Sequence, residues 1–303
     1  MMSETSTQPT STAVQTAEER LQLLLPGIYR GRTDEVQPVS MGSAPLAFDV
    51  EGNVAWDRMW GSFCDLAMAG GPPHKGKLLE PGTPESIIAE PVRYAEVCNE
   101  ITRGIELAAR LRVEPSTLPG WLRVSCTSDA MAGWLLRAIT MENVSVCLDG
   151  DSILLPAGPA FRVEKEIKNV ITVTVKTAHY WSGHLIRLQK LGIGNLFYQL
   201  DSEAPLLQPA WHVAPESTDV RGRIERTLED ATGLRTTEHR YANWIGLECG
   251  SVPSAITTMR RLVASNILCR REETAIFLPL TADPERDSER IGRSVAELLE
   301  RTA

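Results

Sequence analysis

The chain has no excess of positive charge. Its 303 residues include 31 lysines and arginines against 39 aspartates and glutamates, a formal net charge of −8. A cationic surface is what attracts nucleic acid or anionic lipid. We therefore expect neither nucleic acid nor a membrane as partner, although a local basic pocket is compatible with this balance.

Long apolar runs and paired cysteines are also missing. No stretch approaches the roughly 20 apolar residues of a membrane span, and the N-terminus has neither the basic nor the apolar region of a signal peptide. The six cysteines form no CxxC pair, so we expect reduced, mainly buried thiols in a cytoplasmic protein. The Ser/Thr/Gln-rich residues 1–17 predict a disordered tail.

The motifs of several common chemistries are absent. Residues 70–77, GGPPHKGK, lack the spacing and the hydroxyl of a phosphate-binding loop, and residues 191–196, LGIGNL, carry two of the three glycines of a dinucleotide fold. Neither GxSxG nor HExxH occurs. His179 and His184 are five residues apart, which predicts that they do not share a helix face. We therefore expect no metal site, and no motif identifies a cofactor.

The chain does contain an internal similarity. Residues 101–157 align with residues 224–280 without a gap, at a constant offset of 123 positions and with 15 identical residues in 57. The identities include Trp121, Cys126 and Ser128, which meet Trp244, Cys249 and Ser251. Self-similarity of this kind predicts a duplicated module.

Each copy predicts the order α-β-α-β-β-α and hence an α+β fold. An Asp-Gly turn between two apolar runs predicts the hairpin of the first copy. The helical spacing of aromatic residues predicts a further helix over residues 54–69. The expected organisation, after the tail, is as follows: residues 18–91 a helical and irregular N-terminal region, 92–184 the first module, 185–216 a connector and 217–303 the second module.

Residues 164–181 are the most unusual stretch. The segment NVITVTVKT alternates like a β-strand, but the aligned part of the second copy, ERIGRSVAELLERT, is an amphipathic helix. Because repeated modules keep their elements, we predict a helix. On a helix the basic and polar residues form one stripe, which the second copy lacks, and such a stripe attracts anions.

The favoured hypothesis is an enzyme that acts on a small carboxylate- or phosphate-bearing metabolite at this helix, with no reaction class indicated. We expect proton transfer by a lysine with a depressed pKa or by the histidine of the stripe. The candidate catalytic residues are Lys165, Lys176 and His179, and the candidate ligand-binding residues are Arg162, Lys168, Asn169, His74 and Lys75.

Three alternatives remain open at the level of sequence. The stripe is equally typical of a solvated helix face. Cys64 is a candidate nucleophile, but its apolar surroundings favour a buried structural thiol. The protein is alternatively a non-catalytic assembly or regulatory protein that uses the duplicated module as a protein interface, and homo-oligomerisation is left open.

Overall fold

The computed structural model describes residues 16–39, 42, 44–211 and 218–300. Within them the chain has an α+β fold, in which helices surround two antiparallel sheets. The helices are Ala17–Leu24 (α1), Pro84–Ala89 (α2), Pro91–Ala109 (α3), Asp129–Met141 (α4), Lys168–His179 (α5), Arg187–Glu203 (α6), Thr218–Thr232 (α7), Val252–Ala264 (α8) and Pro284–Glu300 (α9). The strands are Val113–Pro115 (β1), Trp121–Ser125 (β2), Cys147–Asp149 (β3), Ser152–Pro156 (β4), Trp244–Glu248 (β5), Arg270–Glu272 (β6) and Ala275–Pro279 (β7).

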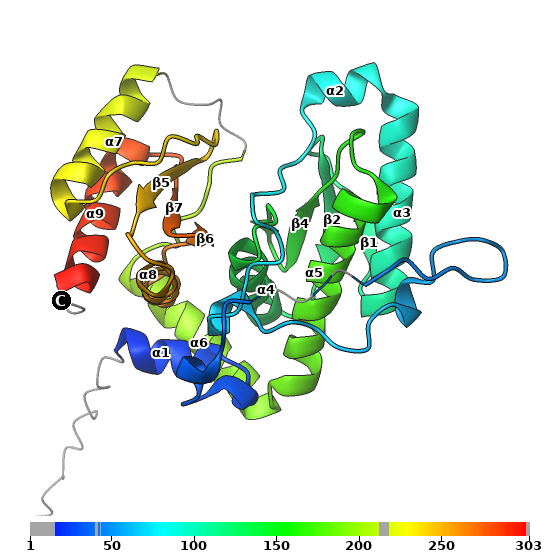
Figure 1. Cartoon of the computed structure of the whole chain (residues 1–303), viewed down its shortest axis with the longest axis horizontal. Coiled ribbons are helices and arrows are strands. Elements are labelled where there is room, and N and C mark those ends of the chain that lie inside the picture. The colour runs from blue at the N-terminus through cyan, green and yellow to red at the C-terminus, as the bar shows by residue number, and fades with distance from the viewer. Residues whose placement is uncertain (1–15, 40–41, 43, 212–217, 301–303) are drawn as a thin grey trace, which may run out of the picture.

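The fold has two lobes that meet at their base. Figure 1 shows the first sheet backed by α3 and α5 and the second sheet backed by α7 and α9, while α1, α4, α6 and α8 lie where the lobes join. The first sheet has the order β1-β2-β4-β3 and the second the order β5-β7-β6. Of the described residues, none belongs to a helix long and apolar enough to cross a membrane.

The two halves repeat the same local features. Ser128 caps α4 by accepting a hydrogen bond from the backbone N–H of Met131, and Ser251 caps α8 in the same way. Asn143 and Asn266 follow these helices with φ of 61° and 64°, in the left-handed region that asparagine tolerates better than most residues. The shared order of elements is what the predicted duplication requires, and an origin from one module stays a prediction.

The similarity extends upstream of the predicted module boundaries. Leu79 forms a parallel bridge with Val144 in the first half, and Leu207 forms one with Ile267 in the second. Each half therefore begins with an extended segment that runs beside its hairpin. The first half also has the short additional strand β1, which the predicted module lacks.

The predicted helix over residues 54–69 is wrong. The segment forms only two short 3-10 turns, Trp56–Arg58 and Ala67–Ala69. Phe48 pairs with Val54 in an antiparallel bridge, and the Trp56 indole donates to Glu100 at 2.7 Å. These tertiary contacts hold the start of the segment out of a helix.

The connector predicted over residues 185–216 contains helix α6, which passes through two glycines. A Cβ at Gly192 would lie 3.3 Å from Leu23, and one at Gly194 would lie 3.4 Å from Ala130. The glycines therefore let α6 pack closely against α1 and α4, and this packing offsets their low helix propensity. Residues 212–216, like 1–15 of the predicted tail, lie outside the described part of the chain.

Candidate functional site

The predicted stripe belongs to a helix, as expected from the second copy. One π-helical turn, Val163–Ile167, leads into α5, and a second, Tyr180–His184, follows it. Ten of the twelve residues of α5 are buried, including Lys168 and Lys176. The stripe is thus partly inside the protein, where a charged side chain needs partners.

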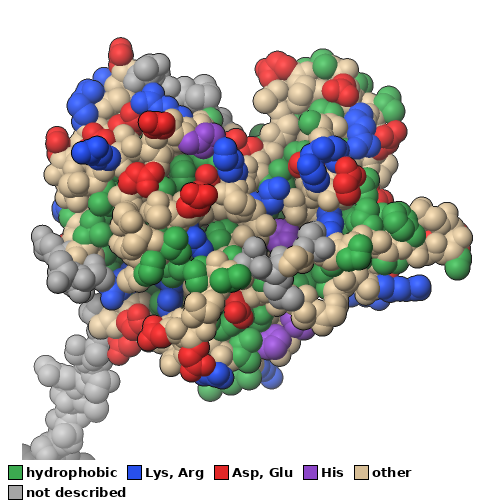
Figure 2. All heavy atoms as spheres, in the orientation of Figure 1, with side chains coloured by type: hydrophobic (Ala, Val, Ile, Leu, Met, Phe, Trp, Pro, Cys, Tyr) green, Lys and Arg blue, Asp and Glu red, His purple; other side chains and the backbone are tan. Residues whose placement is uncertain are grey.

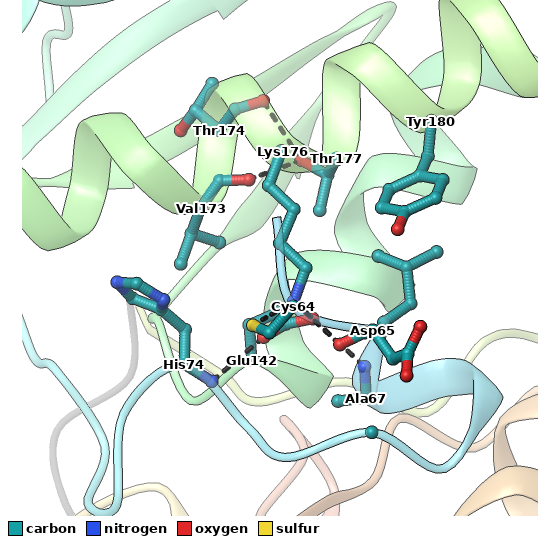
Figure 3. A network of polar contacts seen from close by, with 12 residues as sticks. Cys64, Asp65, Ala67, His74, Glu142, Val173, Thr174, Lys176, Thr177 and Tyr180 are labelled. Atoms are coloured by element: carbon teal, nitrogen blue, oxygen red, sulfur yellow. Dashed lines mark hydrogen bonds and ion pairs between the residues drawn. The ribbon is translucent and has the colours of Figure 1, made fainter. Parts of the chain in front are cut away.

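Lys176 is completely buried and paired with a carboxylate. Its ammonium group lies 2.8 Å from Oε1 of Glu142, which is also 0% exposed. It also donates to the backbone oxygen of Asp65 at 2.9 Å and to Sγ of Cys64 at 3.3 Å. Figure 3 shows the side chain reaching from α5 into the middle of this group. Because an ammonium group has three donors, Lys176 is fully used.

Glu142 organises the same region from the end of α4. Besides Lys176 it accepts hydrogen bonds from the backbone N–H of Ala67 at 3.0 Å and of His74 at 2.9 Å. The carboxylate therefore ties the irregular segment before α2 to two helices. These bonds satisfy a buried ion pair that would otherwise be costly.

The charge of Glu142 determines how Lys176 titrates. Burial pulls the pKa of Lys176 down, but the nearby carboxylate and Cys64 more than offset it, so that the pKa is raised. This direction is opposite to the depressed lysine pKa expected for a proton acceptor. Lys176 stays protonated at neutral pH.

Three other predicted ligand-binding residues lie around this ion pair. Nε2 of His74 is 3.1 Å from Oδ1 of Asn169. The backbone N–H of Lys75 donates to the carbonyl of Glu142, and its own carbonyl accepts from Asn143. The structure thus brings His74, Asn169 and Lys176 into one region, but through bonds that hold the segment in place.

The remaining basic candidates are split between surface and interior. Arg162 and Lys165 are exposed, and Arg162 pairs with Glu166 at 3.3 Å. Lys168 is buried and donates to the carbonyl of Ala44. Arg162, Lys165, Lys168 and Lys176 therefore do not converge on one pocket.

His179 forms a contact that the sequence did not predict. Its Nε2 lies 3.2 Å from Nε2 of His184, so the predicted separation of the two imidazoles is wrong. The wide π-helical turn over residues 180–184 brings residues five apart onto one face. Burial lowers the pKa of His179, and His184 lowers it further. Within the described residues no group of three or more potential metal ligands occurs.

The other half also contains a completely buried cation. Arg270 on β6 is 0% exposed, and its guanidinium lies 4.1 Å from the ring centre of Phe277, 4.4 Å from Tyr241 and 5.0 Å from Trp244. It also pairs with Glu272 at 2.6 Å. Burial lowers the pKa of Arg270, against the opposing charge of Glu272.

Glu272 joins the two halves at this point. Its Oε1 accepts from the hydroxyl of Tyr241 and from the backbone N–H of Leu78, which belongs to the extended segment of the first half. Glu80, two residues further along that segment, is half-buried, and burial raises its pKa. The joint between the lobes therefore carries carboxyl groups.

A cavity of about 670 Å³ opens beside this joint, away from Lys176. Figure 2 shows a notch in the surface between the two lobes, whereas the lining of the cavity itself comes from the second half except for Gly76 and Lys77. Four glutamates line the cavity against two basic side chains, and the buried ring of Phe277 also lines it. The charged lining residues are Glu238, Glu248, Glu272, Glu273, Lys77 and Arg235.

Sequence reasoning missed this cavity. The turn Glu272-Glu273-Thr274 indicated only the hairpin of the second copy, and no local pattern places Gly76 and Lys77 beside it. The one available signal was the concentration of glutamates in the second copy. Comparison with known protein families, curated proteins and solved structures found no match to this chain.

Proposed function

We propose that the protein is a non-catalytic assembly or regulatory protein that binds a basic segment of a partner protein in the cavity that the second half forms beside Gly76 and Lys77. The observation that carries this proposal is the acidic lining of an open cavity of about 670 Å³. That volume is in the range of ligand pockets, roughly 300 to 1,000 Å³. The cavity is thus large enough to receive side chains of another protein.

The carboxylates that can best bind a partner are those that are not already engaged in hydrogen bonds within the protein. Glu238 and Glu273 are exposed residues of the lining, whereas Glu272 is held by Arg270 and Tyr241. A lysine side chain can lay its alkyl stem along apolar surface and keep its ammonium group at the rim.

The electrostatics favour a cation over an anion. Lys77 and Arg235 are outnumbered by glutamates in the lining, and the whole chain carries a net charge of −8. Exposed ion pairs contribute only about 0.2 to 1 kcal/mol each, so several must act together. We expect binding that is moderate and weakens as salt is added.

The test uses fluorescein-labelled pentalysine and measures its binding by fluorescence anisotropy. The Glu238→Gln/Glu273→Gln double variant should weaken binding about three- to tenfold, because it removes two exposed ion pairs. The matched control, Glu51→Gln/Glu164→Gln, removes two exposed glutamates outside the lining and should bind like the wild type.

Two results would overturn the proposal. One is wild-type protein that binds labelled pentaglutamate as well as pentalysine. The other is equal weakening in the lining variant and the control, which would indicate general charge attraction rather than a site.

The enzyme for a small anionic metabolite stays a prediction. The bonds of Lys176 and the exposure of Lys165 supply no shared pocket for it. A screen of phosphorylated and carboxylated metabolites by thermal shift tests it directly, because a ligand that binds only the folded chain raises the Tm. A rise that disappears in Lys165→Met would favour the enzyme.

A further inference from the structure

A second, smaller cavity lies where α1 meets α8, two helices that pack together at the base of the lobes (Figure 1). Its volume is about 380 Å³, and residues from Gly31 to Asp34 close it from a third side. Seven of its nine lining residues carry polar or charged side chains. Because ligand pockets span roughly 300 to 1,000 Å³, this cavity is sized for a small polar molecule.

Two arginines of α8 supply the positive charge of this cavity. Nε of Arg260 and Nη1 of Arg261 are buried without a hydrogen-bond partner, and neither arginine forms an ion pair with any described residue. A Cβ at Gly70 would lie 3.8 Å from Nη1 of Arg260 and 3.9 Å from the backbone oxygen of Thr33, so this guanidinium lies beside the 3-10 turn Thr33–Glu35. A guanidinium has five N–H donors. Acceptors of a ligand can therefore bind here without displacing a bond of the protein.

Two carboxylates line the same cavity. Glu18 on α1 accepts a hydrogen bond from Nε2 of Gln22 at 2.8 Å, and Oε1 of Gln22 accepts one from the backbone N–H of Gly31 at 3.1 Å. Gln22 therefore fixes the carboxylate of Glu18 relative to the turn. Asp34 is exposed, and its side chain makes no hydrogen bond within the described part of the chain. Both carboxylates thus keep lone pairs that can accept from a cation.

The opposite charges of this cavity act on each other without touching. Burial lowers the pKa of Arg260, and the charges of Glu18 and Asp34 act in the opposite direction. Yet no ion pair among the described residues joins either arginine to either acid. A simple anion would be attracted by the arginines and repelled by the carboxylates, and the reverse holds for a simple cation. A ligand that carries both charges satisfies both halves of the lining.

We propose that this cavity binds a small zwitterion, an α-amino acid, between α8 and α1. Arg260 and Arg261 hold its carboxylate, since the planar guanidinium fork matches the two oxygens of a carboxylate. Glu18 and Asp34 hold its ammonium group. The site shares no lining residue with the cavity beside Glu272, so it does not rest on the proposed binding of a basic segment.

A thermal-shift panel of the twenty standard L-amino acids, each at about 10 mM, provides the first test, because a ligand that binds only the folded chain raises the Tm. Isothermal titration calorimetry then measures the affinity of the amino acid that raises the Tm most. Its α-amide lacks the carboxylate, and its N-acetyl derivative lacks the ammonium group. Each should bind at least about tenfold more weakly, because each loses charge-assisted hydrogen bonds.

A charge-balanced double variant tests the residues. Asp34→Asn/Arg261→Gln should weaken amino-acid binding at least about tenfold. The matched control, Asp57→Asn/Arg58→Gln, removes the same two charges from exposed residues outside the lining and should bind like the wild type. Asp34→Asn alone changes one exposed residue and should weaken binding about threefold or more, which keeps the test valid if the double variant is unstable. Pentalysine should bind all of these variants equally.

Four results would overturn the proposal. The first is a panel in which no amino acid raises the Tm. The second is an α-amide or N-acetyl derivative that binds as tightly as its parent amino acid. The third is inorganic phosphate that binds as tightly as the amino acid, which would show a site for simple anions. The fourth is equal weakening in the cavity variants and in the control.

Discussion

Each half of the molecule contains a cationic side chain that is 0% exposed, Lys176 in the first and Arg270 in the second, and the two are held in different ways. Lys176 in the first half has three acceptors for its three donors, and its pKa is raised by Glu142 against the effect of burial. Arg270 in the second half is surrounded by three aromatic rings, and burial lowers its pKa. Among the described residues, Nε and Nη2 of Arg270 have no hydrogen-bond partner.

This difference between Lys176 and Arg270 shows which of the two buried cations lies next to a cavity that a ligand can enter. The bonds of Lys176 and Glu142 hold the irregular segment before α2 against α4 and α5. They leave no donor of the Lys176 ammonium group unused. Arg270 stands at the joint between the lobes, and its partner Glu272 lines the cavity. Lys176 thus stabilises the interior of the first half, whereas Arg270 lies next to the lining of the cavity in the second half.

The largest expected effect comes from removing the partner of Lys176. Glu142→Leu leaves a buried ammonium group without its carboxylate and should lower the free energy of unfolding by about 3 to 5 kcal/mol, as measured by urea denaturation. The Lys176→Met/Glu142→Leu double variant should recover part of this loss, because no unpaired charge remains. A loss below about 1 kcal/mol in the single variant would contradict a structural role.

A smaller effect is expected at Arg270. Arg270→Met removes the ion pair and the contacts with the rings and should cost about 1 to 3 kcal/mol of unfolding free energy. The cost is lower than at Glu142 because Glu272 is only half-buried and keeps its bonds to Tyr241 and Leu78. Urea denaturation measures the free energy of unfolding of both variants. A larger loss in Arg270→Met than in Glu142→Leu would contradict the expected order.

The smallest effect concerns the pH dependence of stability. Burial lowers the pKa of His74, so the unfolded chain takes up this proton before the folded chain does. The resulting stability is present above the usual histidine pKa of about 6.5 and is lost as pH falls through the lower folded value. His74→Gln should therefore flatten, without abolishing, the fall in Tm between neutral and mildly acidic pH. An unchanged slope would show that His74 does not contribute.

Sequence periodicity and internal alignment predicted the elements of the two halves well. The helix over residues 164–181 is the clearest case, because its own pattern favours a strand and only the second copy indicated a helix. The π-helical turn at Tyr180–His184 has no such signal, so the contact of His179 with His184 was missed. The course of α6 through Gly192 and Gly194 depends on close packing with α1 and α4, which no local pattern encodes.

The candidate site was harder to predict because its contacts are distant in sequence. The stripe lies on a helix, as predicted, but the partner of Lys176 is Glu142, which caps the C-terminal end of α4. Without that partner, a line of lysines indicates an anion site. With it, the same lysine becomes part of the core. The cavity beside Glu272 likewise combines residues 76–77 with residues 235–277, and no single stretch of sequence contains it.

Hydrogen exchange followed by mass spectrometry, with and without pentalysine, tests most directly where the chain binds. Residues 235–239 and 272–277 line the cavity, and their amides should exchange more slowly when the peptide is bound. Residues 163–184 should exchange at the same rate in both samples. Protection confined to residues 163–184 would contradict the account and return the site to the helix around Lys176.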